Sequence, residues 1–233
     1  MLKYILLLTP LFIYAQTYMA KIEPIEKLTI YSQTSGQIIK LDKNDETKVV
    51  NKTLIKLDDK LEMQKLSIYK KQLSLYKEKL TLLNSNYIKF KSIHGKSDYE
   101  KDEKYYEVIN LKITIKNLEL SIEDIKDTIA KKSIKVKNLY IKEFAVNKND
   151  YISTGTKLAT AYDISGAKLI VYVSSDDYKD IKNKKVLLDG KSDIATISKV
   201  GKTLDDTFIS AYKVELKLKS DKFGKAVKVE FVK

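Results

Sequence analysis

The chain has 233 residues, 43% of them hydrophobic, so it can bury a substantial core. It has no Cys and a single His, His94, which excludes disulfides, Cys nucleophiles and Cys/His metal clusters. The formal net charge is +13, and every basic residue is a Lys. These lysines are spread among acidic residues and lack the bidentate fork of Arg, so we expect no nucleic-acid binding. An anionic membrane surface would suit the charge as well.

Residues 1–15 have the features of a signal peptide. Lys3 supplies a positive charge, residues 4–14 form an apolar run, and Ala15 offers a cleavage site before Gln16. The run is shorter than the roughly 20 residues that span a bilayer, although an uncleaved anchor stays open as the alternative. Either way we expect the rest of the chain to be exported. Residues 16–28 are expected to form a strand that joins the C-terminal domain.

Two flanking segments, 29–58 and 133–163, share one pattern of strand, polar turn, strand, turn and strand. They also end alike, in Lys52-Thr53-Leu54 and Thr156-Lys157-Leu158, each followed by further apolar residues. We interpret them as two halves of one β-domain that an insertion divides. After them, the alternating apolar and polar residues of 164–233 predict a small β-barrel with half-buried strands.

The insertion, residues 59–132, carries apolar residues at alternating steps of three and four, which is typical of an antiparallel coiled coil. The residues of this seam are Leu66, Tyr69, Leu73, Tyr76, Leu80, Leu83, Tyr87 and Phe90 on the first arm, and Val108, Leu111, Ile115, Leu118, Ile122, Ile125 and Ile129 on the second. Ile109, Ile113 and Leu120 add a second stripe, which predicts a wider buried face on the second arm. Arms of ~33 residues would reach about 50 Å.

Capping signals mark the ends of the two arms. Asp59, with Glu62 three residues later, is expected to cap the first helix. Gly95 suits a left-handed turn that ends this helix. Ser97 and Glu100 form a capping-box motif that starts the second helix, which places the tip near residues 93–97.

The order of these parts resembles the periplasmic adaptor subunits, or membrane fusion proteins (HlyD-like family), of tripartite efflux and secretion systems. The resemblance covers nearly all of the mature chain. It includes residues 53–58, similar to the family's Gly-x-x-Leu-x-x-Leu-Asp run, residues 152–158, and residues 168–181, similar to the strand and short helix that open its barrel domain. It implies an α+β fold: a split lipoyl-like β-sandwich (barrel-sandwich hybrid), an inserted coiled-coil α-hairpin and a small β-barrel. Little chain remains for a membrane-proximal domain.

The sequence departs from the family at several turns and at the tip. Asn stands where the family usually has Gly at Asn51, Asn138 and Asn183. Asn tolerates a left-handed turn best after Gly. The family's tip often carries Arg, Leu and Ser, and here Asn86, Phe90 and Ser97 fall at these places. The Arg is therefore lost, and Lys89 or Lys91 is expected to supply a cation.

The resemblance implies a non-enzymatic adaptor that bridges an inner-membrane transporter, of RND or ABC type, and an outer-membrane channel. It implies a homo-oligomer, trimer or hexamer, in the periplasm of a Gram-negative bacterium and associated with the inner membrane. The residues expected to contact the channel are Phe90, Ile93, His94, Lys96 and Ser97. No cofactor or metal is expected. The alternative is a free-standing periplasmic coiled-coil scaffold or chaperone.

Two residues invite a chemical role that we consider less fitting. Lys60 follows Asp59 at the place where biotinyl and lipoyl carriers have their modified Lys, but a long helix is expected to begin here. His94 falls at a predicted exposed turn without a neighbouring carboxylate, as a solvated loop residue or a contact residue would. No Gly-rich phosphate loop or Ser/His/Asp arrangement is present.

Overall fold

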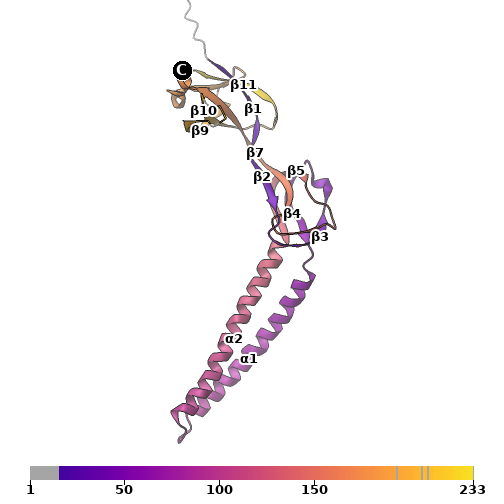
Figure 1. Ribbon diagram of the computed structural model, residues 1–233, viewed down its shortest axis with the longest axis vertical. Coiled ribbons are helices and arrows are strands. Elements are labelled where there is room, and N and C mark those ends of the chain that lie inside the picture. The colour runs from indigo at the N-terminus through magenta and orange to yellow at the C-terminus, as the bar shows by residue number, and fades with distance from the viewer. Residues whose placement is uncertain (1–15, 193, 206, 209, 233) are drawn as a thin grey trace, which may run out of the picture. The chain divides into compact units, whose positions relative to one another are not determined.

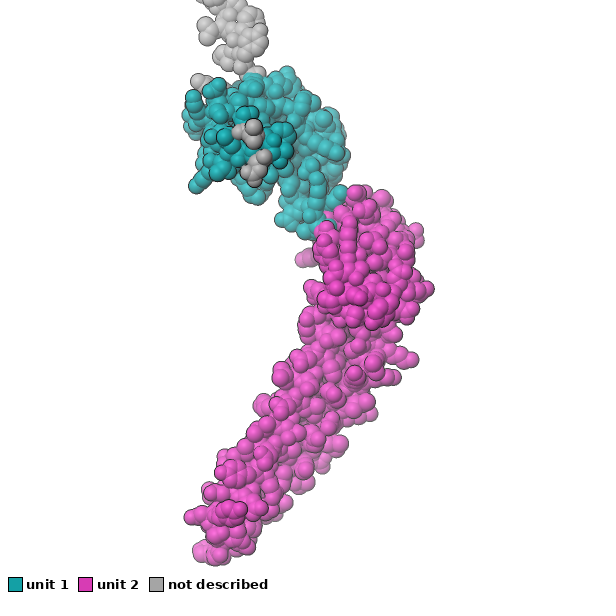
Figure 2. All heavy atoms as spheres, viewed as in Figure 1, with its two compact units in different colours: residues 1–28, 162–233 teal, residues 29–161 magenta. Residues whose placement is uncertain are grey.

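The computed structural model describes residues 16–232 except 193, 206 and 209, so the expected signal peptide lies outside the described residues. The fold is mixed α/β, and its elements fall into two compact units (Figure 2). Unit 1 joins the described residues up to Leu28 to those from Tyr162 onward, and unit 2 is Thr29–Ala161. No helix in the described part of the chain has the length and apolar character needed to cross a bilayer.

The elements of each unit follow in chain order (Figure 1). Unit 2 contains β3 (Gly36–Leu41), the 3-10 helix η1 (Lys43–Asp45), β4 (Val49–Leu57), α1 (Lys60–Lys91), α2 (Asp98–Lys131), β5 (Ser133–Phe144) and β6 (Tyr151–Ile152). Unit 1 contains β1 (Thr17–Lys21), α3 (Ser175–Tyr178), the 3-10 helix η2 (Ile181–Asn183), β8 (Lys185–Leu188), β9 (Ala195–Leu204), β10 (Ala211–Leu218) and β11 (Ala226–Val232). Two further strands, β2 (Glu23–Tyr31) and β7 (Lys157–Ser174), pair with each other and contribute residues to both units.

In unit 2 the strands before and after the helices form one body. β4 and β5 are antiparallel, with Lys56 opposite Ser133, and β3 pairs with β6, with Gly36 opposite Ile152. The strands share one apolar core. The two helices extend from the adjoining ends of β4 and β5. Its buried residues are Ile38, Val50, Leu54, Ile55, Leu57, Val136, Ile141, Phe144, Val146, Ile152, Leu158, Ala159 and Ala161.

The helices α1 and α2, here called the helical pair, have 32 and 34 residues and run antiparallel (Figure 1). Lys77 and Glu119 join them at 2.9 Å, and the rings of Tyr87 and Tyr105 lie 5.2 Å apart. Every seam residue predicted from the sequence is buried or half-buried. The fully buried ones lie on α2 and are Val108, Leu111, Ile115 and Ile122.

The expected wider buried face on α2 is wrong. Ile109 is half-buried, but Ile113 and Leu120 are more than half exposed. Two helices that pack only on each other shield a single stripe of each, and residues on the outward side stay in solvent. The second stripe of α2 is therefore an exposed surface.

The expected cap of α1 is confirmed in position but wrong in its bond. Asp59 is the N-cap residue, but its side chain makes no capping bond. Instead, Asp58 Oδ1 accepts a hydrogen bond from the Lys60 backbone N at 3.0 Å. The Glu62 carboxylate, expected to support the cap, binds Lys132 Nζ at 2.6 Å. Glu62 therefore takes part in a long-range ion pair with Lys132 and not in a local capping motif with Asp59.

Lys132 fixes the base of the helical pair. Its Nζ donates to the Asp58 carbonyl at 2.8 Å, and its own carbonyl accepts from the Leu57 amide at 2.9 Å. The Lys132 side chain is only 9% exposed, and its hydrogen bond holds the pKa of Glu62 below the ordinary value. One side chain thus connects the last turn of α2 with the first turn of α1 and the end of β4.

The three Asn residues at expected turns behave differently. Asn138 has a φ of 53°, in the left-handed region, as expected from its sequence. Asn51 and Asn183 do not, so the expectation is wrong for them. The pairing of β4 with β5 shifts register between Val50 and Lys52, which accommodates Asn51 without a left-handed residue.

Unit 1 is built on antiparallel strands. One sheet has the order β1–β11–β8, and β10 pairs with both β7 and β9. Tyr18 of β1 donates to Asp177 at 2.6 Å, and Lys184 binds the same carboxylate at 2.8 Å, so the N-terminal strand is held by side chains as well as by its ladder. The buried core is Ala20, Ile22, Ala167, Leu169, Val171, Val173, Ile181, Val186, Leu188, Ala195, Val214, Leu216, Leu218, Val227, Val229 and Phe231.

Candidate contact site at the tip of the helical pair

The tip is a short turn between the end of α1 at Lys91 and the start of α2 at Asp98 (Figure 1). It begins with two hydrogen bonds that tighten the last turn of α1, including one from the Ile93 amide to the Phe90 carbonyl at 3.2 Å. Gly95 has a φ of 89°, which confirms the expected left-handed conformation. Nothing lies within 4 Å of the place where a Cβ would be, so the backbone angle, not space, favours glycine.

The predicted capping box at the start of α2 is confirmed. Ser97 Oγ accepts a hydrogen bond from the Glu100 amide at 3.3 Å, and Glu100 Oε2 accepts one from the Ser97 amide at 3.0 Å. Both amides would otherwise lack a partner at a helix N-terminus. The turn is thereby fixed to the helix that follows it.

Lys96 connects the capping box with the end of α1. Its Nζ binds Glu100 Oε1 at 2.7 Å and lies 5.3 Å from the centroid of the Phe90 ring. An ammonium at this distance from a ring face is attracted to it. The Lys96 ammonium also lowers the pKa of Glu100 to about 2, together with the hydrogen bonds from Ser97. Lys96 therefore supplies an ordered cation at the tip.

The remaining predicted tip residues lie on the turn itself. Ile93 is 48% exposed and His94 is exposed. The sequence prediction missed Tyr99, which is 79% exposed one residue inside α2. The sequence feature that could have identified Tyr99 is an aromatic residue next to a capping box, at a helix position outside the seam. Lys96 thus contacts Phe90, and both Lys96 and Ser97 bind Glu100, whereas Ile93 and Tyr99 are exposed.

The lowered pKa of Glu100 makes the tip resistant to acid. A depressed carboxyl pKa gives stabilisation that is fully present above the ordinary value of 4.5 and is lost as the pH falls through about 2. We expect NMR titration of the Glu100 side-chain carboxyl carbon to give a midpoint of about 2. In the Lys96→Met variant the midpoint should rise toward 4.5. Equal midpoints in both proteins would show that Lys96 does not hold Glu100.

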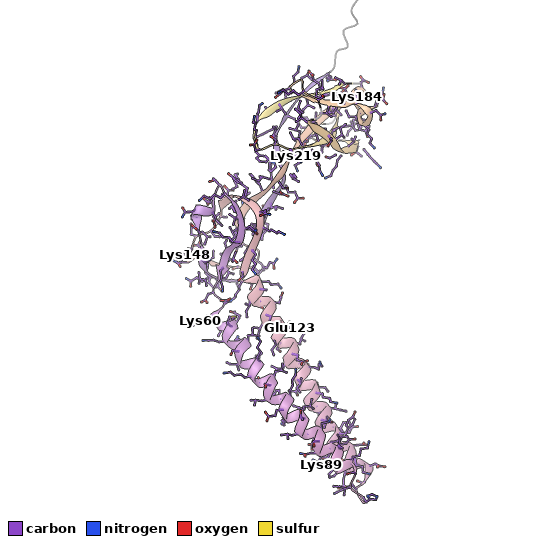
Figure 3. All side chains as sticks on the ribbon, turned by 180° about the vertical axis from the view of Figure 1, so that it is seen from behind. Lys60, Lys89, Glu123, Lys148, Lys184 and Lys219 are labelled. Carbon is purple, nitrogen blue, oxygen red and sulfur yellow. The ribbon has the colours of Figure 1, made fainter. Side chains whose placement is uncertain are left out.

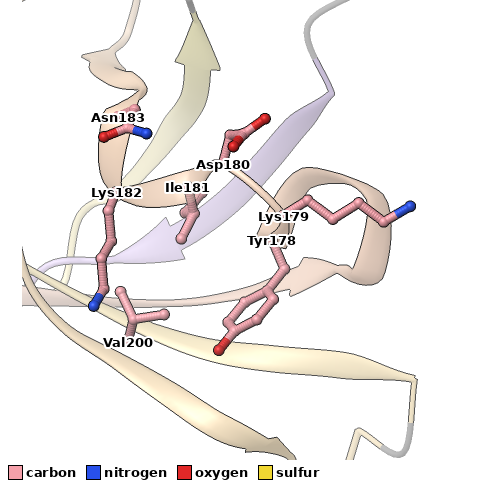
Figure 4. Close-up of a pocket in the computed structure, with 7 residues that line it drawn as sticks. All are labelled: Tyr178, Lys179, Asp180, Ile181, Lys182, Asn183 and Val200. Atoms are coloured by element: carbon pink, nitrogen blue, oxygen red, sulfur yellow. The ribbon is translucent and has the colours of Figure 1, made fainter.

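Hollows occur on both units of the described chain. The hollow in Figure 4, of about 270 Å³, lies between the segment after α3 and the strand β9. Tyr178, Ile181 and Lys182 extend toward Val200, while Lys179 points away. Asp180 is the one carboxylate among the residues that line it. Among the described residues, no group of three or more His, Cys, Asp or Glu is placed to hold a metal ion.

No protein-family model matches the sequence, and no curated protein matches it. Solved structures do match the fold. MacA from Actinobacillus actinomycetemcomitans is 16% identical with a TM-score of 0.66, covering 94% of this chain and 79% of its own. The membrane fusion protein Spr0693 from Streptococcus pneumoniae R6 is 9% identical with a TM-score of 0.70, covering 94% of this chain and 100% of its own. ZneB from Cupriavidus metallidurans is 13% identical with a TM-score of 0.52, covering 93% and 97%.

These similarities span both units and the helical pair, since they cover almost the whole chain. At such low identity they report on architecture, which persists after sequence similarity is lost. The chain therefore has the fold of the membrane fusion proteins, the resemblance that the order of its segments indicated.

Proposed function

We propose that this protein is a non-enzymatic adaptor that bridges an inner-membrane transporter and an outer-membrane channel in an efflux or secretion complex. In this proposal the strands on either side of the helical pair are a split lipoyl-like domain, residues 29–58 and 133–163. The helical pair is a coiled-coil hairpin, residues 59–132, and residues 16–28 and 164–233 form the barrel domain. The protein acts in the periplasm of a Gram-negative bacterium, at the inner membrane.

The observation that carries the proposal is the ordered tip at the end of the helical pair. A helical pair whose only purpose was to stabilise itself would need neither this length nor a fixed turn. The tip presents Ile93 and Tyr99 to solvent beside the ordered cation of Lys96. Apolar and aromatic side chains with a nearby cation are the usual anchors of protein–protein contacts. The proposed channel contacts are Phe90, Ile93, His94, Lys96 and Ser97.

Two partners are proposed. The tip would bind the periplasmic helices of the channel, and unit 1 would bind a transporter of RND or ABC type. Several copies, a trimer or a hexamer, would surround a conduit. Solved structures of this fold include an efflux transporter and a membrane fusion protein, and these names support the proposal. Fold alone does not determine function.

Site-specific crosslinking tests the proposal. The chain has no Cys, so His94→Cys can carry a photo-crosslinker as the only labelled position. We expect this variant to crosslink to an outer-membrane channel protein in producing cells. Lys116→Cys, exposed on α2 well away from the tip, is the matched control and should give no channel adduct. Adducts of His94→Cys only with soluble client proteins would instead favour a free-standing scaffold or chaperone.

A further inference from the structure

A second hollow of unit 1, of about 280 Å³, lies where β9 begins and β10 ends. It shares no lining residue with the hollow in Figure 4. Two of the described residues that line it are lysines, Lys217 and Lys219, and none of them is acidic. The hollow therefore combines a concave surface with a single sign of charge, and both suit an anionic ligand.

The sheet itself forms the floor of this hollow. Leu218 of β10 lies between Ala167 of β7 and Ala195 of β9 in one row of the ladder, and all three side chains are buried. Because side chains alternate along a strand, this row points into the core and turns its backbone toward the outer face. Gly166, the residue before Ala167, adds no side chain there. The space stays open because this part of the sheet carries so few outward side chains.

Aliphatic side chains form the walls. Ile25 of β2 lies against Gly166, where a Cβ would be 2.8 Å from Ile25 Cδ1, too close for two carbons. Gly166 has no positive φ, so space and not the backbone angle favours glycine at this position. Ile194, just before β9, also lines the hollow and is 42% exposed. An apolar chain in the hollow would therefore be shielded from water by two branched side chains.

The two lysines are available to a ligand. Both are exposed, and Figure 3 shows Lys219 at the surface of unit 1. Neither forms an ion pair with another described residue. Glu215, two residues before Lys217, is already engaged with Lys199 at 3.7 Å. Thr196 lies opposite Lys217 in the ladder and adds a hydroxyl to the same face. The cations and the hydroxyl thus supply hydrogen-bond donors beside the aliphatic walls.

We propose that this hollow binds a free medium-chain fatty acid. The carboxylate binds Lys217 and Lys219, and the aliphatic chain lies between Ile25 and Ile194. The methylene groups of the lysines cover the chain while their ammonium groups stay in water. A small inorganic anion would leave the aliphatic walls unused, and a flat membrane surface would not need a hollow. The inference goes beyond the proposed function and does not depend on it, because the tip takes no part in it.

NMR titration of the full mature chain with sodium octanoate tests the inference. We expect the amide signals of Ile194, Thr196 and Leu218 to shift along one saturable curve. Butanoate has the same carboxylate on a shorter chain and should bind at least about tenfold more weakly, since each buried CH₂ tightens binding up to about fourfold. 1-Octanol has the same chain length without the charge and should also bind at least about tenfold more weakly.

Variants separate the two parts of the site. Lys217→Gln combined with Lys219→Gln should weaken octanoate binding at least about tenfold. Lys213→Gln combined with Lys222→Gln is the matched control, because it removes two exposed lysines that do not line the hollow, and it should bind octanoate as the unaltered protein does. Ile194→Ser should weaken the binding of octanoate but not of butanoate, since it reduces only the apolar wall.

Three results would overturn the inference. Equal affinities for butanoate and octanoate would mean that surface lysines alone hold the anion. Equal weakening by the two double variants would mean a general attraction between charges. Binding to vesicles of anionic lipid without binding to octanoate would assign the lysines to a membrane surface. Each of these results would leave the adaptor role untouched, because the His94→Cys crosslink tests that role at the tip.

Discussion

We expect the Lys132→Met variant to lower the free energy of unfolding of unit 2 by about 2 to 4 kcal/mol. Met preserves most of the buried side-chain volume but removes the ammonium that binds Glu62 and the Asp58 carbonyl. The Glu62 carboxylate is then left without a cation, and its Oε2 already has no hydrogen-bond partner among the described residues. Urea unfolding followed by far-UV circular dichroism measures the loss.

The pH dependence separates this ion pair from a simple packing defect. In the unaltered protein the pKa of Glu62 is lowered, so its stabilisation is present at neutral pH and is lost as the pH falls through the lowered value. In Lys132→Met the unpaired carboxylate should have a raised pKa, and its protonation in acid should relieve the strain of burial. The stability difference between the two proteins should therefore shrink as the pH falls.

The neighbouring Lys131→Met variant is the control. Lys131 is exposed and, among the described residues, pairs with Asp127 alone, on its own helix, so its loss should cost less than about 0.5 kcal/mol. Equal losses from both substitutions would contradict a special role for Lys132. Adding Glu62→Leu to Lys132→Met should restore part of the stability, because the unpaired charge is then removed.

The sequence predicted those features of the fold that depend on local spacing. The seam residues and the capping box of Ser97 and Glu100 are visible because helix periodicity and capping act within a few residues. The expected role of Asp59 and Glu62 failed for the opposite reason. Glu62 binds Lys132, which lies at the far end of the insertion, and no local pattern reports that pairing.

The tip could be predicted in part. Gly95 and Ser97 indicated the position of the tip, because a left-handed turn and a helix cap each depend on only a few neighbouring residues. The contact of Lys96 with Phe90 depends on the path of the turn, which brings Lys96 back toward α1. This path cannot be read from the sequence. Tyr99 was missed because its exposure follows from which way the helix faces, a tertiary property.

Two isoleucines on one helix distinguish the buried seam from the exposed side of α2. Ile115 is 5% exposed in the seam, and Ile113, two residues before it, is 53% exposed. Ile115→Lys should lower the free energy of unfolding by at least about 2 kcal/mol, since it removes a buried side chain and brings a charge into the seam. Ile113→Lys should change it by less than about 0.5 kcal/mol, because Lys is a good helix former at an exposed site.

Urea unfolding followed by far-UV circular dichroism measures both losses. Equal losses from Ile113→Lys and Ile115→Lys would contradict the assignment of Ile115 to the buried seam and of Ile113 to the exposed side of α2.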